Sequence, residues 1–406
     1  MRKINPKDFK VATRTTSRDI NRRIALNIIR ENQPLSRADL ARTMKITRGV
    51  AGMLVQELID QQMIYEGTTG ETLRGRKPTF LHLRTHDRLV VAVDVRFSKT
   101  YLMLSDFAGQ QIALEMFDTI FEVPQFLENL SFRIKRILKA QNAENTCEGV
   151  GLVVPGMVDL KTGKVLNAPT LGWRDEEIRD KLANLLDMPV HIENAGRACA
   201  IGHLWLEKEG AGSQNFVYVN VSDGVGIGII RNGEVIRGHD NIAGEFGHMP
   251  LNLEGPPCMC GASGCWEAYV SNLASIARYF GHNLSKVDTN SIVEHHNSFT
   301  VIDLIGRARS GDPKAITAID STARYLGLGL AAIINLLNPD VIYLAGEIIM
   351  AWDLIEARVR QAISERALTE AAAKTPLRLA TSEPYPRLRG AAALLAAPTF
   401  AAPQVA

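Results

Sequence analysis

The stretch DNIAGEFGHMPLNLEGPPCMCGASGCWE, residues 240–267, decides how the rest of the chain is interpreted. It holds one histidine and three closely spaced cysteines, namely His248, Cys258, Cys260 and Cys265. Three thiolates and an imidazole are the ligands of a closed tetrahedral zinc site, and the glycines between them permit tight turns. A closed site leaves no open position for water, so the pattern predicts a structural zinc ion.

The overall composition indicates a large protein of a reducing compartment. The chain has 406 residues, of which 46% are hydrophobic and 22% charged, and this length predicts two to three domains. Five cysteines are an odd number, and the basic residues 1–10 include no apolar segment of the kind that a secretory signal needs. No apolar run reaches the ~18–20 residues of a membrane helix, so we expect a cytoplasmic protein without membrane insertion.

The net charge of +2 conceals an uneven distribution of charge along the chain. Residues 1–90 contain 18 Lys and Arg against 9 Asp and Glu, whereas the remainder is acidic. A basic N-terminal part on an acidic body indicates that this part meets a polyanion, although a solvated basic arm would have the same composition.

Three helical segments in this basic part follow the plan of a helix-turn-helix. Side chains that cap helices predict where the segments begin. The expected caps are Ser17 for a helix to about Glu31, Ser36 with Asp39 for a helix to Met44, and Thr47 for a helix to about Gln61. The third helix has an apolar face of Val50, Leu54 and Leu58, and two extended runs after it, 63–66 and 79–83, indicate a wing.

The third helix and the wing tip carry the expected DNA contacts, because the second helix of such a pair enters the major groove N-terminus first. Arg48 can donate two hydrogen bonds to guanine, and small residues beside it let the backbone approach the groove floor. The tip 75–78, Gly-Arg-Lys-Pro, suits a narrow A·T-rich minor groove, with contact to phosphates alone as the alternative. The predicted DNA-binding residues are Thr47, Arg48, Ala51, Gly52, Arg74, Arg76 and Lys77.

From about residue 89 the pattern changes to alternating strands and helices. Two sets of strand-like runs, each with a glycine-containing turn, predict two similar α/β lobes. The Ala/Pro-rich end of the chain is expected to be disordered. The expected boundaries are 1–84 for the winged helix, 85–194 with 381–396 for the first lobe, 195–380 for the second lobe and 397–406 for a disordered tail.

The pattern of residues 240–267, Gly-Glu-Phe-Gly-His followed by Cys-x-Cys-Gly-x-x-Gly-Cys-Trp-Glu, resembles the signature of the ROK family of repressors, open reading frames and sugar kinases. The resemblance extends over the whole chain, and a winged helix is a feature of the repressor branch. It implies an α/β fold of the actin-like (ribonuclease H-like) sugar-kinase type, with two lobes around a cleft. It also implies that a monosaccharide is held by Gly156, Asn194, Glu245, His248 and Glu267, with His248 offering its second ring nitrogen to the sugar.

The residues that a sugar kinase needs are replaced. Kinases of the family carry the general base as the Asp of a Glu-Asn-Asp run, and here the third residue is Ala195, which cannot accept a proton. The phosphate-binding turns of the family are rich in glycine, because backbone N–H groups must approach the phosphates closely. Here the corresponding turns, 94–99, 222–228 and 345–347, introduce bulky side chains and two acids, Asp223 and Glu347.

These observations predict a sugar-responsive repressor that is not an enzyme. The resemblance implies a homodimer or tetramer on an A·T-rich operator with an inverted repeat. The alternative is a sugar kinase with an added DNA-binding arm, and the identity of residue 195 distinguishes this alternative from the repressor. A repressor controlled by a protein partner is a third hypothesis.

Overall fold

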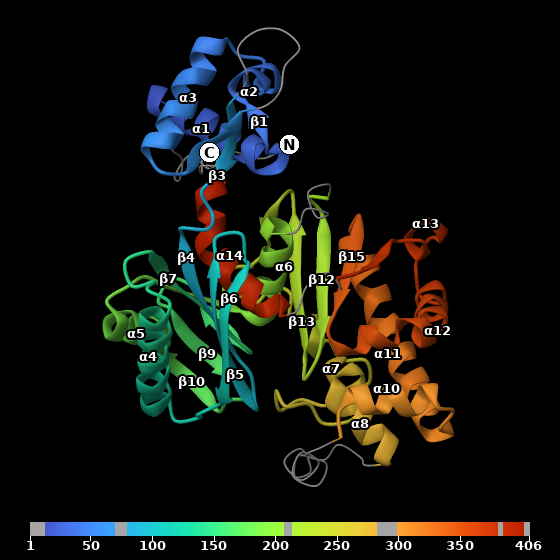
Figure 1. The fold of residues 1–406 in the computed structure, drawn as a ribbon. Helices are drawn as coiled ribbons and strands as arrows, with labels where there is room; N and C mark the ends of the chain where they lie inside the picture. The colour runs from blue at the N-terminus through green and yellow to red at the C-terminus, as the bar shows by residue number, and fades with distance from the viewer. Residues whose placement is uncertain (1–12, 70–78, 207–212, 282–298, 381–384, 402–406) are drawn as a thin grey trace.

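The computed structural model describes residues 13–69, 79–206, 213–281, 299–380 and 385–401. These residues form an N-terminal body of helices and a small sheet, which sits above two α/β lobes that lie side by side (Figure 1). The expected fold class, a winged helix-turn-helix joined to a two-lobed α/β body, is confirmed.

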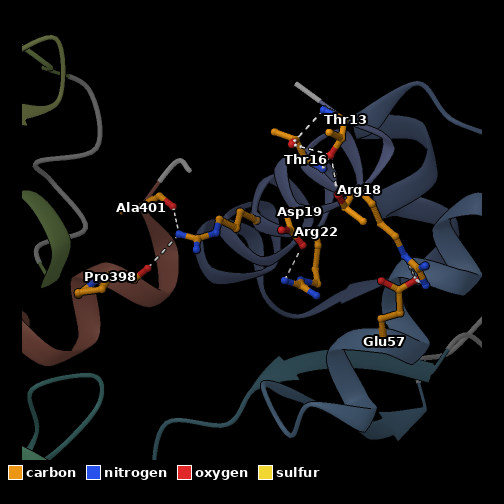
Figure 2. Close-up of polar contacts among 10 residues, drawn as sticks. Thr13, Thr16, Arg18, Asp19, Arg22, Glu57, Pro398 and Ala401 are labelled. Atoms are coloured by element: carbon orange, nitrogen blue, oxygen red, sulfur yellow. Dashed lines mark hydrogen bonds and ion pairs between the residues drawn. The ribbon is translucent and has the colours of Figure 1, made fainter. Parts of the chain in front are cut away.

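The N-terminal body has three helices and a three-stranded sheet in the order β1-β3-β2. Ser36 and Asp39 form the predicted capping box, and Thr47 caps the third helix as expected. The expected first cap is wrong, because Thr13 caps that helix and forms its capping box with Thr16 (Figure 2). The elements are α1 (Arg14–Asn32), β1 (Leu35–Ser36), α2 (Arg37–Met44), α3 (Arg48–Asp60), β2 (Ile64–Thr69) and β3 (Thr79–Leu83).

The first lobe is built on a five-stranded sheet in the order β6-β5-β4-β7-β11, of which β6, β5 and β4 are antiparallel and β4, β7 and β11 parallel. Along β4, alternate residues face opposite sides of the sheet, as the two-residue period of a strand requires. Val91 and Val93 pack toward α4 and α5, whereas Val90 and Ala92 pack toward two helices between the lobes. The elements are β4 (Leu89–Val95), β5 (Lys99–Asp106), β6 (Gln111–Asp118), α4 (Val123–Ala140), β7 (Cys147–Val154), β8 (Met157–Asp159), β9 (Lys164–Ala168), β10 (Trp173–Glu177), α5 (Ile178–Leu186) and β11 (Val190–Asn194).

The second lobe repeats this strand plan in the order β14-β13-β12-β15-β16, with three antiparallel strands followed by parallel pairing. Its longest helix, α11, packs on the sheet around the fully buried Trp266. None of the described helices combines the length and apolar character needed to span a membrane. The elements are β12 (Phe216–Val221), β13 (Val225–Arg231), β14 (Glu234–Val235), η2 (Phe246–His248), α7 (Glu267–Val270), α8 (Asn272–Phe280), α10 (Val301–Arg309), α11 (Pro313–Leu337), β15 (Val341–Ala345), η3 (Glu347–Ala351), α12 (Trp352–Ser364), α13 (Glu370–Ala373) and β16 (Leu377–Leu379).

Two helices, α6 (Ala195–Leu206) and α14 (Pro386–Phe400), lie between the lobes and extend toward the N-terminal body (Figure 1). The expected disordered tail is wrong for residues 397–400, which continue α14, while residues 402–406 lie outside the described chain. Phe400 is 7% exposed and belongs to the apolar core of the winged helix. Its partners are far away in the sequence, so no local pattern could show that this end of the chain is packed.

Candidate functional site

The histidine and three cysteines of the signature come together where η2 faces the loop that leads into α7. The four ligand atoms, from His248, Cys258, Cys260 and Cys265, all lie within 4.8 Å of one another. The Cys260 and Cys265 sulfurs are 3.7 Å apart, and the Cys258 sulfur is 3.6 Å from His248 Nδ1. Zn–S bonds of about 2.3 Å in a tetrahedron place two sulfurs about 3.8 Å apart. The residues therefore fit a zinc-sized ion in a closed Cys₃His site.

The loop is shaped by its glycines and by the burial of its thiols. Gly261 and Gly264 have φ of +97° and +73°, a region that favours residues without a Cβ. Burial raises the pKa of the Cys258 thiol well above its usual range. A thiolate at this position therefore requires a nearby cation, which is what a bound metal ion would supply.

The two ring nitrogens of His248 face different groups. Nδ1 faces the cysteines, and Nε2 lies 3.9 Å from a carboxylate oxygen of Glu245. Burial raises the pKa of the Glu245 carboxyl, while the nearby His248 lowers it. The imidazole thus connects the three cysteines to a partly buried carboxylate, and a carboxylate can accept hydrogen bonds from hydroxyl groups.

Glu267 connects the loop of residues 258–265, which carries the three cysteines, to the turn between β12 and β13. Its Oε2 accepts a hydrogen bond of 2.8 Å from the Val225 backbone N–H, and its Oε1 lies 3.8 Å from the Cys258 sulfur. A Cβ at Gly224 would lie 2.6 Å from Oε2, so a larger residue at this position would push the carboxylate aside. The carboxylate therefore positions two segments, and its contact with a sugar stays a prediction.

Asn194 and Gly156, which were predicted as sugar contacts, bond to each other. The Asn194 side-chain amide donates to the Gly156 carbonyl at 2.9 Å, and its oxygen accepts from the Gly196 backbone N–H at 2.8 Å. Asn194 therefore caps α6 and fastens it to the turn after β7. A Cβ at Gly156 would lie 2.5 Å from the Asn167 carbonyl oxygen, so a neighbouring backbone explains this glycine without a ligand.

A buried ion network beside Asn194 was not predicted. Glu193 accepts from Arg197 Nε at 2.8 Å and from Arg237 Nη2 at 3.0 Å, and both Glu193 and Arg197 are only 1% exposed. Arg197 Nη1 also donates to the Ala243 carbonyl at 3.5 Å, so the network connects the start of α6 to the segment that carries Glu245. The four-residue spacing between Glu193 and Arg197 gave no helical signal for this pair, because Glu193 ends β11 and only Arg197 lies in α6.

Side chains of the chain itself surround the turns 94–99 and 222–228, which were predicted to be altered phosphate-binding turns. Arg387 Nη2 donates to the Ser222 hydroxyl at 2.6 Å and lies 3.8 Å from Asp94, which also accepts from Arg96 Nε at 2.7 Å. They border an open pocket of about 480 Å³. The pocket is lined among others by Arg96, Tyr101, Ser222, Glu347, Tyr385 and Arg387.

Both positive groups of this pocket are therefore already paired, and two further acids stand nearby. The Asn272 side-chain amide donates to Glu347 at 2.9 Å. Burial raises the pKa of the Asp223 carboxyl, while Arg387 lowers it. A nucleotide phosphate entering here would meet two carboxylates beside arginines that already have partners.

At the start of α3, positively charged side chains without a described ion pair lie beside small residues. Among the described residues, neither Arg48 nor Lys45 has an ion pair or a side-chain hydrogen bond, whereas Arg42 is paired with Asp39. A Cβ at Gly49 or Gly52 would meet nothing within 4 Å, so the fold itself does not require these glycines.

A helical glycine lowers stability by about 1 kcal/mol relative to alanine. Two unrequired glycines on the face that presents Arg48 leave room for a surface from outside the chain to approach the backbone.

Two predictions for α3 need correction. Ala51 is fully buried, so its side chain packs inside the winged helix and cannot reach a DNA groove. Val50 is 37% exposed rather than part of the apolar face, because Ala51, Leu54, Val55 and Leu58 form that face instead. The predicted wing-tip contacts Arg74, Arg76 and Lys77 lie outside the described residues.

Comparison with known proteins matches residues 90–397 to the model of the ROK family. The xylose repressor of Bacillus subtilis is 28% identical over 364 residues, which cover 89% of this chain and 90% of that protein. A crystal structure of a ROK family transcriptional regulator, described as a homologue of the E. coli MLC protein, superposes with a TM-score of 0.78 at 25% identity and covers 95% of this chain and 97% of its own. A ROK family glucokinase from Streptomyces griseus, solved with glucose and AMPPNP, covers 75% of this chain and 98% of its own with a TM-score of 0.64 at 26% identity.

Proposed function

This chain belongs to the ROK family, and on that premise we propose that it is a transcriptional repressor that binds DNA, responds to a monosaccharide and does not phosphorylate it. The observation that carries the proposal is the exposed face of α3, where Arg48 is uncommitted and Gly49 and Gly52 leave the backbone accessible. The similarity to a protein named xylose repressor, over nearly the whole of both chains, supports the same function.

The effector is a monosaccharide bound between the lobes. Glu245 is the side chain best placed to accept a bond from it, because its carboxylate is partly buried beside His248. Gly156, Asn194, His248 and Glu267 complete the proposed site. D-xylose and D-glucose are the first sugars to test. One similar protein is named xylose repressor, and another was solved with glucose.

We place a structural zinc ion on His248, Cys258, Cys260 and Cys265, where it would hold the loop between Glu245 and Glu267 in one conformation. The repressor acts in the cytoplasm as a homodimer or tetramer on an inverted-repeat operator, since a two-fold assembly matches a two-fold site. The wing tip adds contacts to A·T-rich minor grooves.

We expect no turnover when the wild-type chain is assayed with ATP and a panel of monosaccharides in a coupled kinase assay. Ala195 removes the general base, which typically contributes ~10²–10⁴-fold to a rate. Ala195→Asp alone should not restore activity, because the carboxylates of Asp223 and Glu347 would still oppose a nucleotide phosphate. Robust turnover by the wild type would support the alternative of a sugar kinase with a DNA-binding arm.

Arg48→Ala should weaken operator binding by about 1–3 kcal/mol and relax the base preference at one position of each half-site. The measurement is a gel shift on the operator and on variants with single base changes. Arg42→Ala is the matched control, because Arg42 is exposed but already paired with Asp39. Equal losses in the two variants would mean that general charge, rather than groove reading by α3, explains the binding.

A second variant in this test is Gly52→Ala. It should raise the stability of the protein and lower its affinity for the operator. Alanine should stabilise α3 by up to about 1 kcal/mol, because nothing in the fold contacts a Cβ at this position. The same methyl group should weaken operator binding by obstructing approach to the groove. A thermal melt beside the gel shift measures both, and an operator affinity at or above that of the wild type would remove Gly52 from the DNA interface.

A further inference from the structure

We propose that the helix pair α6/α14 positions the DNA-reading body, and that Trp205 and Phe400 at its far end convey sugar binding from the cleft to α1. The inference rests on the proposed function, since it names the residues through which the same sugar site would control operator binding. The two helices are joined to the cleft at one end and to the winged helix at the other (Figure 1).

At the cleft end, each helix begins within a proposed or degenerate ligand site. The amide of Asn194 caps α6 and holds the turn at Gly156. On α14, Arg387 bonds Ser222 of the second lobe and faces Asp94 of the first at 3.8 Å. Arg387 therefore connects the two lobes at the start of α14, and Arg197 of α6 donates to the Ala243 carbonyl of the second lobe, so a change in the separation of the lobes must alter these bonds.

Between the two ends, α6 and α14 are packed backbone to backbone. A Cβ at Gly202 would lie 2.9 Å from the Gly390 backbone nitrogen, and one at Gly390 would overlap the Ala198 carbonyl. On its other side, α14 lies equally close to β7, because a Cβ at Gly151 would overlap the Ala391 carbonyl. Contacts of this kind leave no flexible side chains to absorb a displacement, so the pair moves as one element.

At the far end, the pair supplies two rings to the body that reads DNA. Trp205 of α6 and Phe400 of α14 have ring centroids 6.4 Å apart, and the Arg30 guanidinium lies 5.1 Å and 4.8 Å from them. Burial lowers the pKa of Arg30, and its Nη1 is buried without a hydrogen-bond partner. The two ring faces share the compensation of this cation with Glu31, whose carboxylate lies 3.7 Å from Arg30 Nη2, so the cation is sensitive to how the rings are placed.

Polar contacts fix the rest of α1 to the same helix end. Arg23 donates to the carbonyls of Pro398, at 3.0 Å, and of Ala401 (Figure 2). Asn27 donates to the Phe400 carbonyl at 2.8 Å. Three consecutive turns of α1 are therefore attached to the end of α14.

The orientation of α1 passes directly to the recognition helix. Arg18 Nε donates to Glu57 of α3 at 2.9 Å, in the half of α1 that faces away from α14 (Figure 2). Apolar side chains of α1, including Leu26 and Ile29, share a core with Leu54 and Leu58 of α3. A rotation of α1 on Phe400 would therefore rotate the exposed face of α3.

The covalent linker, residues 84–88, is the competing route between the bodies. Arg88 fastens it to the first lobe through an ion pair with Glu148 and lies 4.0 Å from the Phe107 ring centroid. Among the described residues, the hydrogen bonds, ion pairs and ring contacts of residues 84–88 with other segments go to Met63, Asp106, Phe107 and Glu148, and none of them involves Asn194 or Arg387. The linker therefore holds the winged helix near the first lobe. Of the two routes, only the helix pair α6/α14 has described connections to both lobes, which it needs to respond to a change in their separation.

The test compares Phe400→Ala with the wild-type full-length chain in calorimetry with D-xylose or D-glucose and in operator gel shifts with and without that sugar. In the wild type, saturating sugar should change operator affinity by about 5–150-fold. In Phe400→Ala this ratio should fall to within about twofold of one, while sugar affinity stays within about threefold of the wild type. Phe400→Leu keeps an apolar side chain in the winged-helix core but removes the ring beside Arg30, so it should lose the same ratio while sugar-free operator affinity also stays within about threefold of the wild type. Hydrogen exchange at residues 23–30 should change on sugar binding in the wild type only.

Two control variants distinguish transmission through α6/α14 from a general effect of losing a phenylalanine and from transmission through the linker. Phe132→Ala makes the same substitution at a 64% exposed phenylalanine of α4 and should retain the full ratio. Glu148→Gln loosens the linker and should also retain it. Undiminished coupling in Phe400→Ala, or loss of coupling in Glu148→Gln alone, overturns the inference while leaving the proposed function standing. Absence of any sugar effect in the wild type would instead refute the proposed function.

Discussion

Glu245→Ala should lower the affinity for the effector sugar by about tenfold to a hundredfold. The substitution removes a charged acceptor, and a hydrogen bond to such a group contributes roughly 1.5–3 kcal/mol. Glu245 is partly buried beside His248, so few waters compete for its carboxylate. Sugar-free operator binding should stay at the wild-type level, because the winged helix is not touched. Calorimetry with D-xylose and D-glucose, beside a gel shift, measures both quantities.

Glu254→Ala is the matched control for this prediction, because it removes an exposed carboxylate from the loop that follows the same 3₁₀ helix. Its sugar affinity should equal that of the wild type. If Glu245→Ala binds sugar as tightly as the wild type, Glu245 is not a sugar ligand. If no monosaccharide binds the wild type at millimolar concentration, control by a protein partner becomes the better hypothesis.

Cys260→Ser should abolish metal binding and, with it, most of the sugar response. Metal analysis of the wild type should yield about one zinc ion per chain, and the variant should retain almost none, since a closed site needs all four ligands. Cys260 is the exposed member of the cluster, so its loss disturbs packing least and the effects report on the metal. Sugar affinity should fall because His248 and Glu267 both contact cluster residues.

Cys147→Ser is the control for the zinc experiment, since Cys147 is a half-buried cysteine of β7 far from the cluster in the sequence. Its metal content and sugar affinity should remain those of the wild type. A metal-free wild-type protein that still binds sugar would contradict the zinc assignment.

Features that depend on neighbouring residues could be predicted from the sequence. The caps at Ser36 and Thr47 are local, because each hydroxyl bonds a backbone N–H within three residues. The Cys₃His cluster was also visible, since soft ligands rarely occur together without a shared ion. The alanine at position 195, on which the expected absence of kinase activity depends, could be read from a single position.

Features that depend on distant contacts could not be predicted. The burial of Ala51 instead of Val50 is set by how α3 packs against α1 and the wing strands, which differs by one residue from the simplest helical stripe. Arg387 reaches Ser222 across 165 residues of chain, and Phe400 reaches α1 across more than 370. Alanine-rich composition also concealed that the end of the chain is an ordered helix.

The place of Phe400 in the winged-helix core has a consequence for how the protein is made. The DNA-binding body precedes the lobes in the chain, but its core is complete only when α14, which lies between the lobes, has been synthesised. A nascent chain that has emerged only to the end of the wing lacks Phe400 and Trp205, so its Arg30 is left without either ring. Prematurely terminated chains would therefore carry an unfinished reader. Completion of the sensor thus precedes completion of the part that occupies the operator.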